Sequence, residues 1–170
     1  KALANSANKK KVNGWAIWQQ AEETAAQLLD PAWEGIYDTI QLKCGMNFDE
    51  DGIIRVNETE LTFCQPIFDA AAKTGVKVEA WFNGRANDDG IPDAAYANPQ
   101  ATYDSAVEVL KAYPQWSGYS FDDESNCAPT AVYSQLVDWM EWMDGFSDAI
   151  HTFNSDFTVT NAVQAMFGIQ

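Results

Sequence analysis

Residues 74–82 read Thr-Gly-Val-Lys-Val-Glu-Ala-Trp-Phe, and this stretch decides how the chain is expected to fold. Gly75 ends an apolar helical pattern that runs through Phe63, Ile67 and Phe68, and residues 76–82 follow at once as a strand. A helix joined to a strand by so short a link is typical of parallel strands connected by right-handed crossovers. The stretch therefore predicts an α/β fold built on a parallel sheet.

The same alternation of strand and helix recurs on both sides of this stretch. Further strands are predicted at 14–18, 38–44, 116–121 and 157–162, with an extended segment at 53–56. Helices are predicted at 19–29, 103–113 and 129–153, and a helix capped weakly at Thr59 precedes Gly75. The polar segment 83–100 is rich in Gly, Pro, Asn and Asp, so it is predicted to be a loop.

Two architectures satisfy this alternation, an open doubly wound sheet and a (β/α)8 TIM barrel. The first is disfavoured because the sequence contains neither GxGxxG nor GxxxxGK[ST]. Polar segments after strand ends suit the catalytic face of a barrel. We therefore expect an N-terminal arm at residues 1–12 and a partial barrel domain at 13–170 with only the first four to five βα units. Since half a barrel leaves open sheet edges, a complementary chain or a missing C-terminal half is expected to complete it.

Composition and charge exclude several classes of partner. The formal net charge of −15 would repel phosphate backbones and anionic lipid, so neither nucleic acid nor a membrane is expected as partner. The three cysteines show no CxxC spacing and there is a single histidine, so no metal site and no cofactor are expected. The cysteines are compatible with one disulfide and one free thiol, or with three buried thiols. Asn57-Glu58-Thr59 matches a glycosylation sequon and favours secretion to the extracellular space.

The chemistry-bearing segment is Ser117-Gly118-Tyr119-Ser120-Phe121-Asp122-Asp123-Glu124, at the end of a predicted strand. Side chains alternate along a strand, so Ser120, Asp122 and Glu124 share one face. The two carboxylates would lie about 7 Å apart, close enough to perturb each other's proton affinity. One could then hold a proton while the other stays charged, as glycoside cleavage requires. The alternative is a solvated loop start in which the acidic residues cap a turn.

This segment resembles the DGxDxDxE signature on the fourth barrel strand of the family-18 glycoside hydrolases, the chitinases and endo-N-acetylglucosaminidases. Gly118, Asp122 and Glu124 match the signature, whereas Ser117 and Ser120 replace two aspartates. The stretch Gly75-Val76-Lys77-Val78 also resembles the GVKV sequence that enters the third strand of that family. The resemblance implies a barrel that acts on N-acetylglucosamine-containing glycans by a retaining, substrate-assisted mechanism.

By this resemblance Glu124 would protonate the glycosidic oxygen, and Asp122 would orient the N-acetyl group of the substrate, whose carbonyl is the nucleophile. Ser120 stands where the family has an aspartate that tunes Asp122. Two alternatives therefore stay open: an active glycosidase, or a catalytically inactive glycan-binding or structural relative in an extracellular assembly. A third is another barrel hydrolase whose second carboxylate follows Gln170.

Aromatic side chains at strand ends supply the candidate carbohydrate contacts. Trp81 ends the third predicted strand and Trp18 the first, where a barrel presents side chains to its pocket. Either tryptophan could stack on a sugar ring or be buried in the barrel core. Asn83 could donate hydrogen bonds to sugar hydroxyls. Together with Ser120, these residues are the predicted substrate-binding set.

Overall fold

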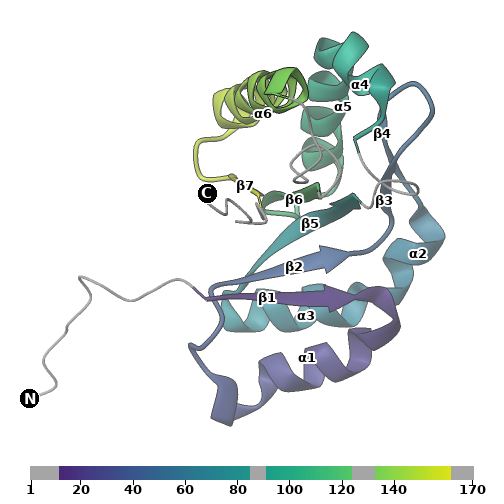
Figure 1. The fold of residues 1–170 in the computed structure, drawn as a ribbon. Coiled ribbons are helices and arrows are strands. Elements are labelled where there is room, and N and C mark those ends of the chain that lie inside the picture. The colour runs from purple at the N-terminus through teal and green to yellow at the C-terminus, as the bar shows by residue number, and fades with distance from the viewer. Residues whose placement is uncertain (1–11, 85–90, 124–132, 162–170) are drawn as a thin grey trace, which may run out of the picture.

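The computed structural model describes residues 12–84, 91–123 and 133–161, and within them the chain forms a five-stranded parallel sheet (Figure 1). The strand order is β1 (Asn13–Ile17), β2 (Thr39–Lys43), β5 (Lys77–Gly84), β6 (Gly118–Asp123) and β7 (Thr158–Asn161). All four pairings between neighbours are parallel. Each of these strands lies within two residues of a predicted one, so the predicted parallel α/β sheet is confirmed.

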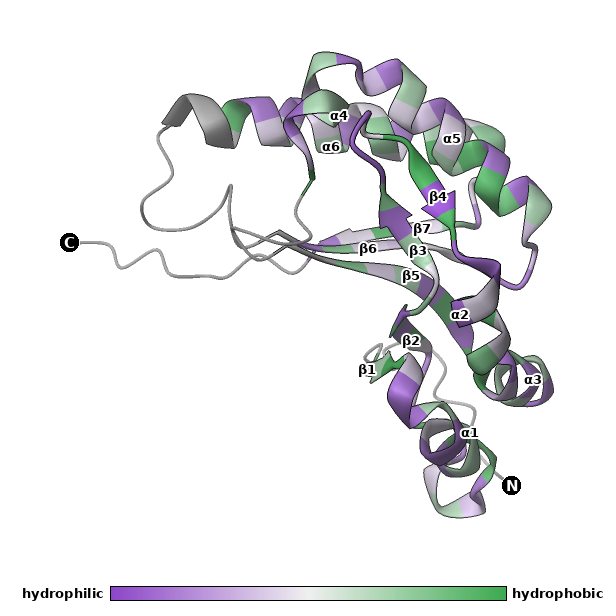
Figure 2. Ribbon diagram, turned by 90° about the vertical axis from the view of Figure 1, so that its right-hand side faces the viewer, coloured by the Kyte–Doolittle hydropathy of each residue, from purple (hydrophilic) through white to green (hydrophobic). Residues whose placement is uncertain are grey.

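Helices connect the strands and lie along the sheet (Figure 1). The four longer ones are α1 (Ala21–Leu29), α3 (Gln65–Thr74), α5 (Pro99–Ala112) and α6 (Tyr133–Phe153). In the orthogonal view, α1 and α3 lie at the β1–β2 end of the sheet, and α5 and α6 at the β6–β7 end (Figure 2). None of the helices in the described residues is long and apolar enough to cross a membrane.

The core lies between the sheet and these helices. Alternate strand residues point toward the helices, and they are almost all apolar: Ile40 and Leu42, Val78, Ala80 and Phe82, Tyr119 and Phe121. Phe146 on α6 is fully buried and packs edge-on against both Tyr119 and Phe121. The Tyr119 hydroxyl donates a hydrogen bond of 2.8 Å to the Ala106 carbonyl on α5, so its one polar atom is satisfied.

Two glycines are required by the backbone. Gly75 ends α3 in the left-handed conformation, with φ of 76°, and its N–H donates to Ala71. Gly118 begins β6 with φ of 146°, and a Cβ there would lie 1.9 Å from the Thr158 carbonyl oxygen of β7. A glycine is thus needed at position 118 because the β7 backbone lies directly against it.

Two segments differ from the prediction. The extended segment predicted at 53–56 is one arm of an antiparallel hairpin formed by β3 (Met46–Phe48) and β4 (Ile54–Val56). The helix expected before Gly75 is divided into α2 (Glu58–Phe63) and α3, because the first helix ends at Cys64 and Pro66 lies in the first turn of the second. The predicted cap of this helix, Thr59, was wrong. The residue that caps α2 is Asn57, whose side chain accepts hydrogen bonds from the N–H groups of Thr59 and Glu60.

The loop predicted at 83–100 was wrong over most of its described length. Asn83 and Gly84 continue β5, α4 (Asp93–Ala97) follows Pro92, and α5 begins at Pro99. Proline is tolerated in a first helical turn because its missing N–H would have no partner there. The two prolines of this segment therefore mark the starts of helices and not only a loop. Of the predicted arm, only Val12 is described, and its N–H donates to Asp38.

Candidate active site on the inner face of the sheet

The second face of the sheet, directed away from the core helices, is polar and aromatic. It carries every other residue of the strands, as the register of neighbouring strands requires. The described side chains that define this inner face are Trp15, Gln41, Glu79, Trp81, Ser120, Thr158 and Thr160. A parallel sheet covered by helices on both sides would present apolar residues here. The polar residues therefore indicate that helices do not cover this face.

A chain of hydrogen bonds crosses the inner face. The Trp15 indole N–H donates to Gln41 Oε1, and Gln41 Nε2 lies 3.2 Å from Thr160 Oγ1. The Thr160 hydroxyl lies 2.8 Å from Glu79 Oε2, and the Thr158 hydroxyl donates to Glu79 Oε1. Both oxygens of the Glu79 carboxylate are therefore hydrogen-bonded. These bonds offset the cost of burying a polar side chain that is only 1% exposed.

Two tryptophans stack at the β1 side of this face. The rings of Trp15 and Trp81 have centroids 5.6 Å apart and planes inclined by 14°. Trp15 is 64% exposed, whereas Trp81 is half-buried. The pair therefore presents an aromatic surface to solvent from inside the curve of the sheet, and flat aromatic rings of this kind can take up the apolar face of a sugar.

Residues 118–123 of the predicted acidic segment form β6, which lies between β5 and β7 in the same sheet. Ser120 pairs with Trp81 on one side and with Thr160 on the other, and Asp122 pairs with Asn83. Ser120 is 1% exposed, and its Oγ has no hydrogen-bond partner in the part of the chain that the structure describes. Asp122 follows two residues later on the same strand and is half-buried. Glu124 lies outside the described residues.

The other predicted contact residues are placed differently. Trp18 lies one residue beyond β1, in the short 3-10 turn Trp18–Gln20, where it packs against Phe63 with ring centroids 5.7 Å apart. It is 37% exposed, so it is not in the core. Asn83 lies on β5, beside Asp122 in register. The structure thus brings Trp81, Asn83, Ser120 and Asp122 to one region of the sheet and leaves Trp18 outside it.

Sequence reasoning missed Trp15, Gln41, Glu79 and the two threonines of β7. A signal for them was present, because residues 39–43 alternate strictly between polar and apolar side chains. In a parallel sheet such alternation indicates one apolar face against helices and one polar face toward a lumen. Among the described residues, no group of three or more His, Cys, Asp or Glu side chains is arranged to hold a metal ion.

Comparison with known proteins gives no match by sequence but several by structure. No protein-family model matches the sequence, and no curated protein sequence matches it significantly. Solved structures with the same fold include chitinases and chitinase-like proteins. The chain has the fold of part of the TIM barrel of these proteins.

Three of these structures illustrate the similarity. The Group IV chitinase of Ostrinia furnacalis, in complex with allosamidin, superimposes with a TM-score of 0.67 at 14% identity over 91% of this chain and 44% of its own. The Cycas revoluta family-18 chitinase, in complex with (GlcNAc)3, gives 0.64 at 14% identity over 93% and 48%. Human YKL-39, a pseudo-chitinase with retained chitooligosaccharide binding, gives 0.65 at 11% identity over 91% and 44%.

The chain spans just under half the length of each of these chitinase-like proteins. The predicted partial TIM barrel is therefore confirmed as a fold. At identities this low the similarity concerns the fold alone.

Proposed function

We propose that this chitinase-like half-barrel belongs to a glycoside hydrolase that cleaves N-acetylglucosamine-containing glycans by a retaining, substrate-assisted mechanism. The observation that supports the proposal best is the position of Asp122. It lies near the carboxyl end of β6, between β5 and β7 in a sheet with the fold of the chitinases, and it shares a strand face with Ser120. Catalytic groups of barrel enzymes lie at this end of the strands.

In this mechanism Glu124 gives its proton to the glycosidic oxygen as the bond from that oxygen to C1 breaks. The carbonyl oxygen of the substrate's N-acetyl group forms a bond to C1 from the opposite side, while Asp122 accepts a hydrogen bond from the amide N–H. Water then attacks C1, gives a proton to Glu124 and displaces the acetamido oxygen. Two inversions at C1 leave its configuration unchanged.

The stacked pair of Trp15 and Trp81 supports the choice of a carbohydrate as ligand. A sugar ring presents C–H groups on one face and hydroxyls at its edge, so it suits an aromatic platform bordered by polar side chains. Trp15 offers such a platform because it is 64% exposed. Thr160, which is half-buried on the same face, supplies a polar neighbour.

A second candidate function is glycan binding without cleavage, and Ser120 favours it. A buried hydroxyl with no partner in the described residues stands where the resemblance places a carboxylate that tunes Asp122. Asp122 therefore lacks the neighbouring acidic group that the resemblance assigns to it. Human YKL-39, which has the same fold, is a pseudo-chitinase that retains chitooligosaccharide binding.

Hydrolysis and binding, measured on the same full-length protein, decide between the two functions. For an active enzyme, Glu124→Gln should abolish release of product from chito-oligosaccharides while calorimetric binding remains. Glu141→Gln, an exposed carboxylate on α6, is the matched control and should leave both unchanged. Binding without any product from the wild type would establish the inactive alternative, and full activity of Glu124→Gln would refute the catalytic assignment.

We also propose that further strands complete the barrel. In the described residues β1 and β7 are the two outer strands of the sheet, each with one edge that no further strand covers. Uncovered edges favour pairing with additional strands, and barrel closure removes them. We assign that role to further strands of the same protein or of a complementary chain. An extracellular location belongs to the proposal as well.

A further inference from the structure

We infer that Asn57 is an N-glycosylation site, modified on its side-chain nitrogen in an oxidising secretory compartment. This inference goes beyond the proposed activity and does not depend on it. Asn57 heads Asn57-Glu58-Thr59, the only Asn-x-Ser/Thr triplet in the sequence. The triplet alone is a weak signal, because such patterns occur by chance. The structure adds three observations that a chance match would not require.

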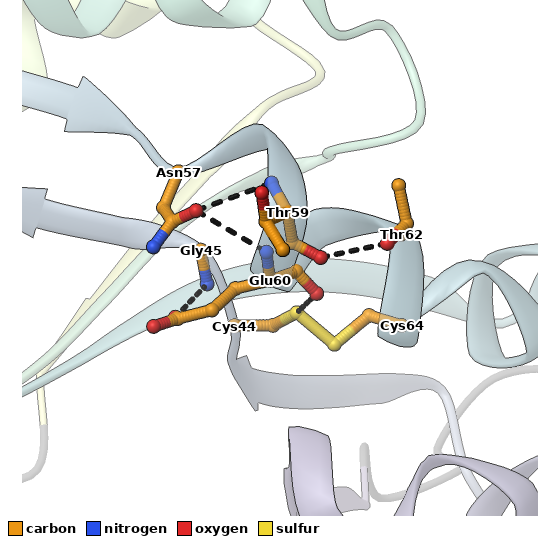
Figure 3. Close-up of a disulfide and its surroundings, with 7 residues drawn as sticks. All are labelled: Cys44, Gly45, Asn57, Thr59, Glu60, Thr62 and Cys64. Atoms are coloured by element: carbon orange, nitrogen blue, oxygen red, sulfur yellow. Dashed lines mark hydrogen bonds between the residues drawn. A yellow bond between two sulfur atoms is a disulfide. The ribbon is translucent and has the colours of Figure 1, made fainter.

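The first observation is that the Asn57 backbone and side-chain oxygen are all held by the fold. Its N–H donates to the Gly45 carbonyl at 2.6 Å, and its carbonyl accepts from Leu61 N–H at 3.0 Å. Its Oδ1 accepts from the N–H groups of Thr59 and Glu60 at 3.1 and 3.3 Å, which caps α2 (Figure 3). An amide side chain that accepts two N–H bonds must place its oxygen there and its nitrogen on the other side.

The second observation is that the Asn57 nitrogen is available. Nδ2 points away from α2 (Figure 3), and it makes no hydrogen bond with any residue that the structure describes. Asn57, Glu58 and Thr59 are all exposed, and no hydrogen bond involves the Thr59 hydroxyl in the described part of the chain. A glycan on Nδ2 would therefore enter solvent and leave the helix cap intact.

The third observation concerns the redox environment. Cys44 and Cys64 form a disulfide that closes a loop containing the triplet (Figure 3). Cys44 is 2% exposed and Cys64 is 0% exposed, so the disulfide is buried. Cys44 directly precedes Gly45, whose carbonyl accepts the hydrogen bond from the Asn57 N–H. Structural disulfides persist in secreted proteins and in the lumen of the secretory pathway, which is also where asparagine is glycosylated.

Glycosylation of Asn57 requires one co-reactant, a lipid-linked oligosaccharide diphosphate. Nδ2 forms a bond to C1 of the first sugar, and the bond between C1 and the diphosphate oxygen breaks. The lipid diphosphate leaves with the bonding electrons, and Nδ2 loses one proton. The resulting secondary amide keeps Oδ1 as an acceptor, so the two hydrogen bonds that cap α2 survive.

The experiment expresses the full-length chain in a eukaryotic secretory host and examines the peptide containing Asn57 by mass spectrometry. We expect an oligosaccharide that peptide-N-glycosidase removes with conversion of Asn57 to Asp. Thr59→Ala should abolish the modification and Thr59→Ser should retain it, and both leave the Asn57 cap in place. Asn57→Asp should abolish it while preserving the midpoint of thermal unfolding, because Asp caps a helix as well as Asn does.

Two results would overturn the inference. One is an unmodified Asn57 peptide in secreted wild-type protein that retains the disulfide between Cys44 and Cys64. The other is a modification that persists in Thr59→Ala, since that result would show a linkage independent of the triplet.

Discussion

The Gln41 side chain on β2 lies 3.2 Å from the Thr160 hydroxyl on β7, although β5 and β6 separate the two strands in the sheet. In a flat sheet the two backbones would be about 14 Å apart, three spacings of roughly 4.8 Å. The contact therefore requires the sheet to curl toward its polar face. The same curl brings Trp15 on β1 to Trp81 on β5 across β2. Curvature of this kind is what a barrel demands of its strands.

Replacing Thr160 with valine should destabilise the protein by about 1–3 kcal/mol. Valine has nearly the same shape, but it can neither donate to Glu79 nor accept from Gln41. The buried Glu79 carboxylate would lose one of its two hydroxyl partners. Chemical denaturation followed by tryptophan fluorescence measures the change in the free energy of unfolding.

Thr160→Ser is the matched control, since it keeps the hydroxyl and removes only a methyl group. It should cost much less than Thr160→Val. Equal losses for the two variants would mean that packing, and not the hydrogen-bond chain, matters at this position.

Removing the disulfide by Cys64→Ser should lower the free energy of unfolding by about 3 kcal/mol. The estimate comes from the loop-closure entropy of a cross-link between residues separated by 20 positions. Reduction of the wild type should give a similar loss, whereas reducing agent should not alter Cys64→Ser further. Denaturation curves with and without reductant test this, and a curve unchanged by reduction would contradict it.

Trp81→Ala should weaken binding of chito-oligosaccharides by about tenfold, equivalent to roughly 1.4 kcal/mol. The loss is expected because Trp81 supports Trp15, the exposed ring of the pair. Calorimetric titration of the full-length protein provides the affinity. Trp33→Ala is the control: Trp33 is 37% exposed and, like Trp81, stacked on another aromatic ring, that of Tyr37, but it lies in the short turn Pro31–Trp33 outside the inner face. A comparable loss in both variants would refute the assigned platform.

The β3–β4 hairpin should weaken in acid through Asp49. The pKa of this carboxyl lies below its ordinary value of 3.8, chiefly because Ile53 N–H donates to it, with Arg55 and Asp51 N–H adding to the effect and partial desolvation opposing it. A folded pKa below the unfolded one means that the stabilisation is complete above the unfolded value and is lost as pH falls through the folded value. The stability advantage over Asp49→Asn should therefore shrink below about pH 4. A difference that stays constant down to strongly acidic pH would contradict this.

Much of the architecture followed from sequence because its signals are local. Gly75 ended a helix, and the next strand followed it almost at once, as the pattern indicated. The predictions failed where one residue type serves two purposes. Pro66 and Pro99 lie in the first turns of helices. The segment predicted as a loop therefore contains α4 and the start of α5, and the helix before Gly75 is two helices.

The sequence by itself determined the strands, their parallel connections and the shared strand face of Ser120 and Asp122, because periodicity and turn chemistry act over a few residues. Only the tertiary structure decided that Trp15 pairs with Trp81, that Thr160 links Gln41 to Glu79, and that Cys44 pairs with Cys64. These contacts join residues 20 to 119 positions apart. They depend on strand register and on the curl of the sheet, neither of which any short stretch of sequence specifies.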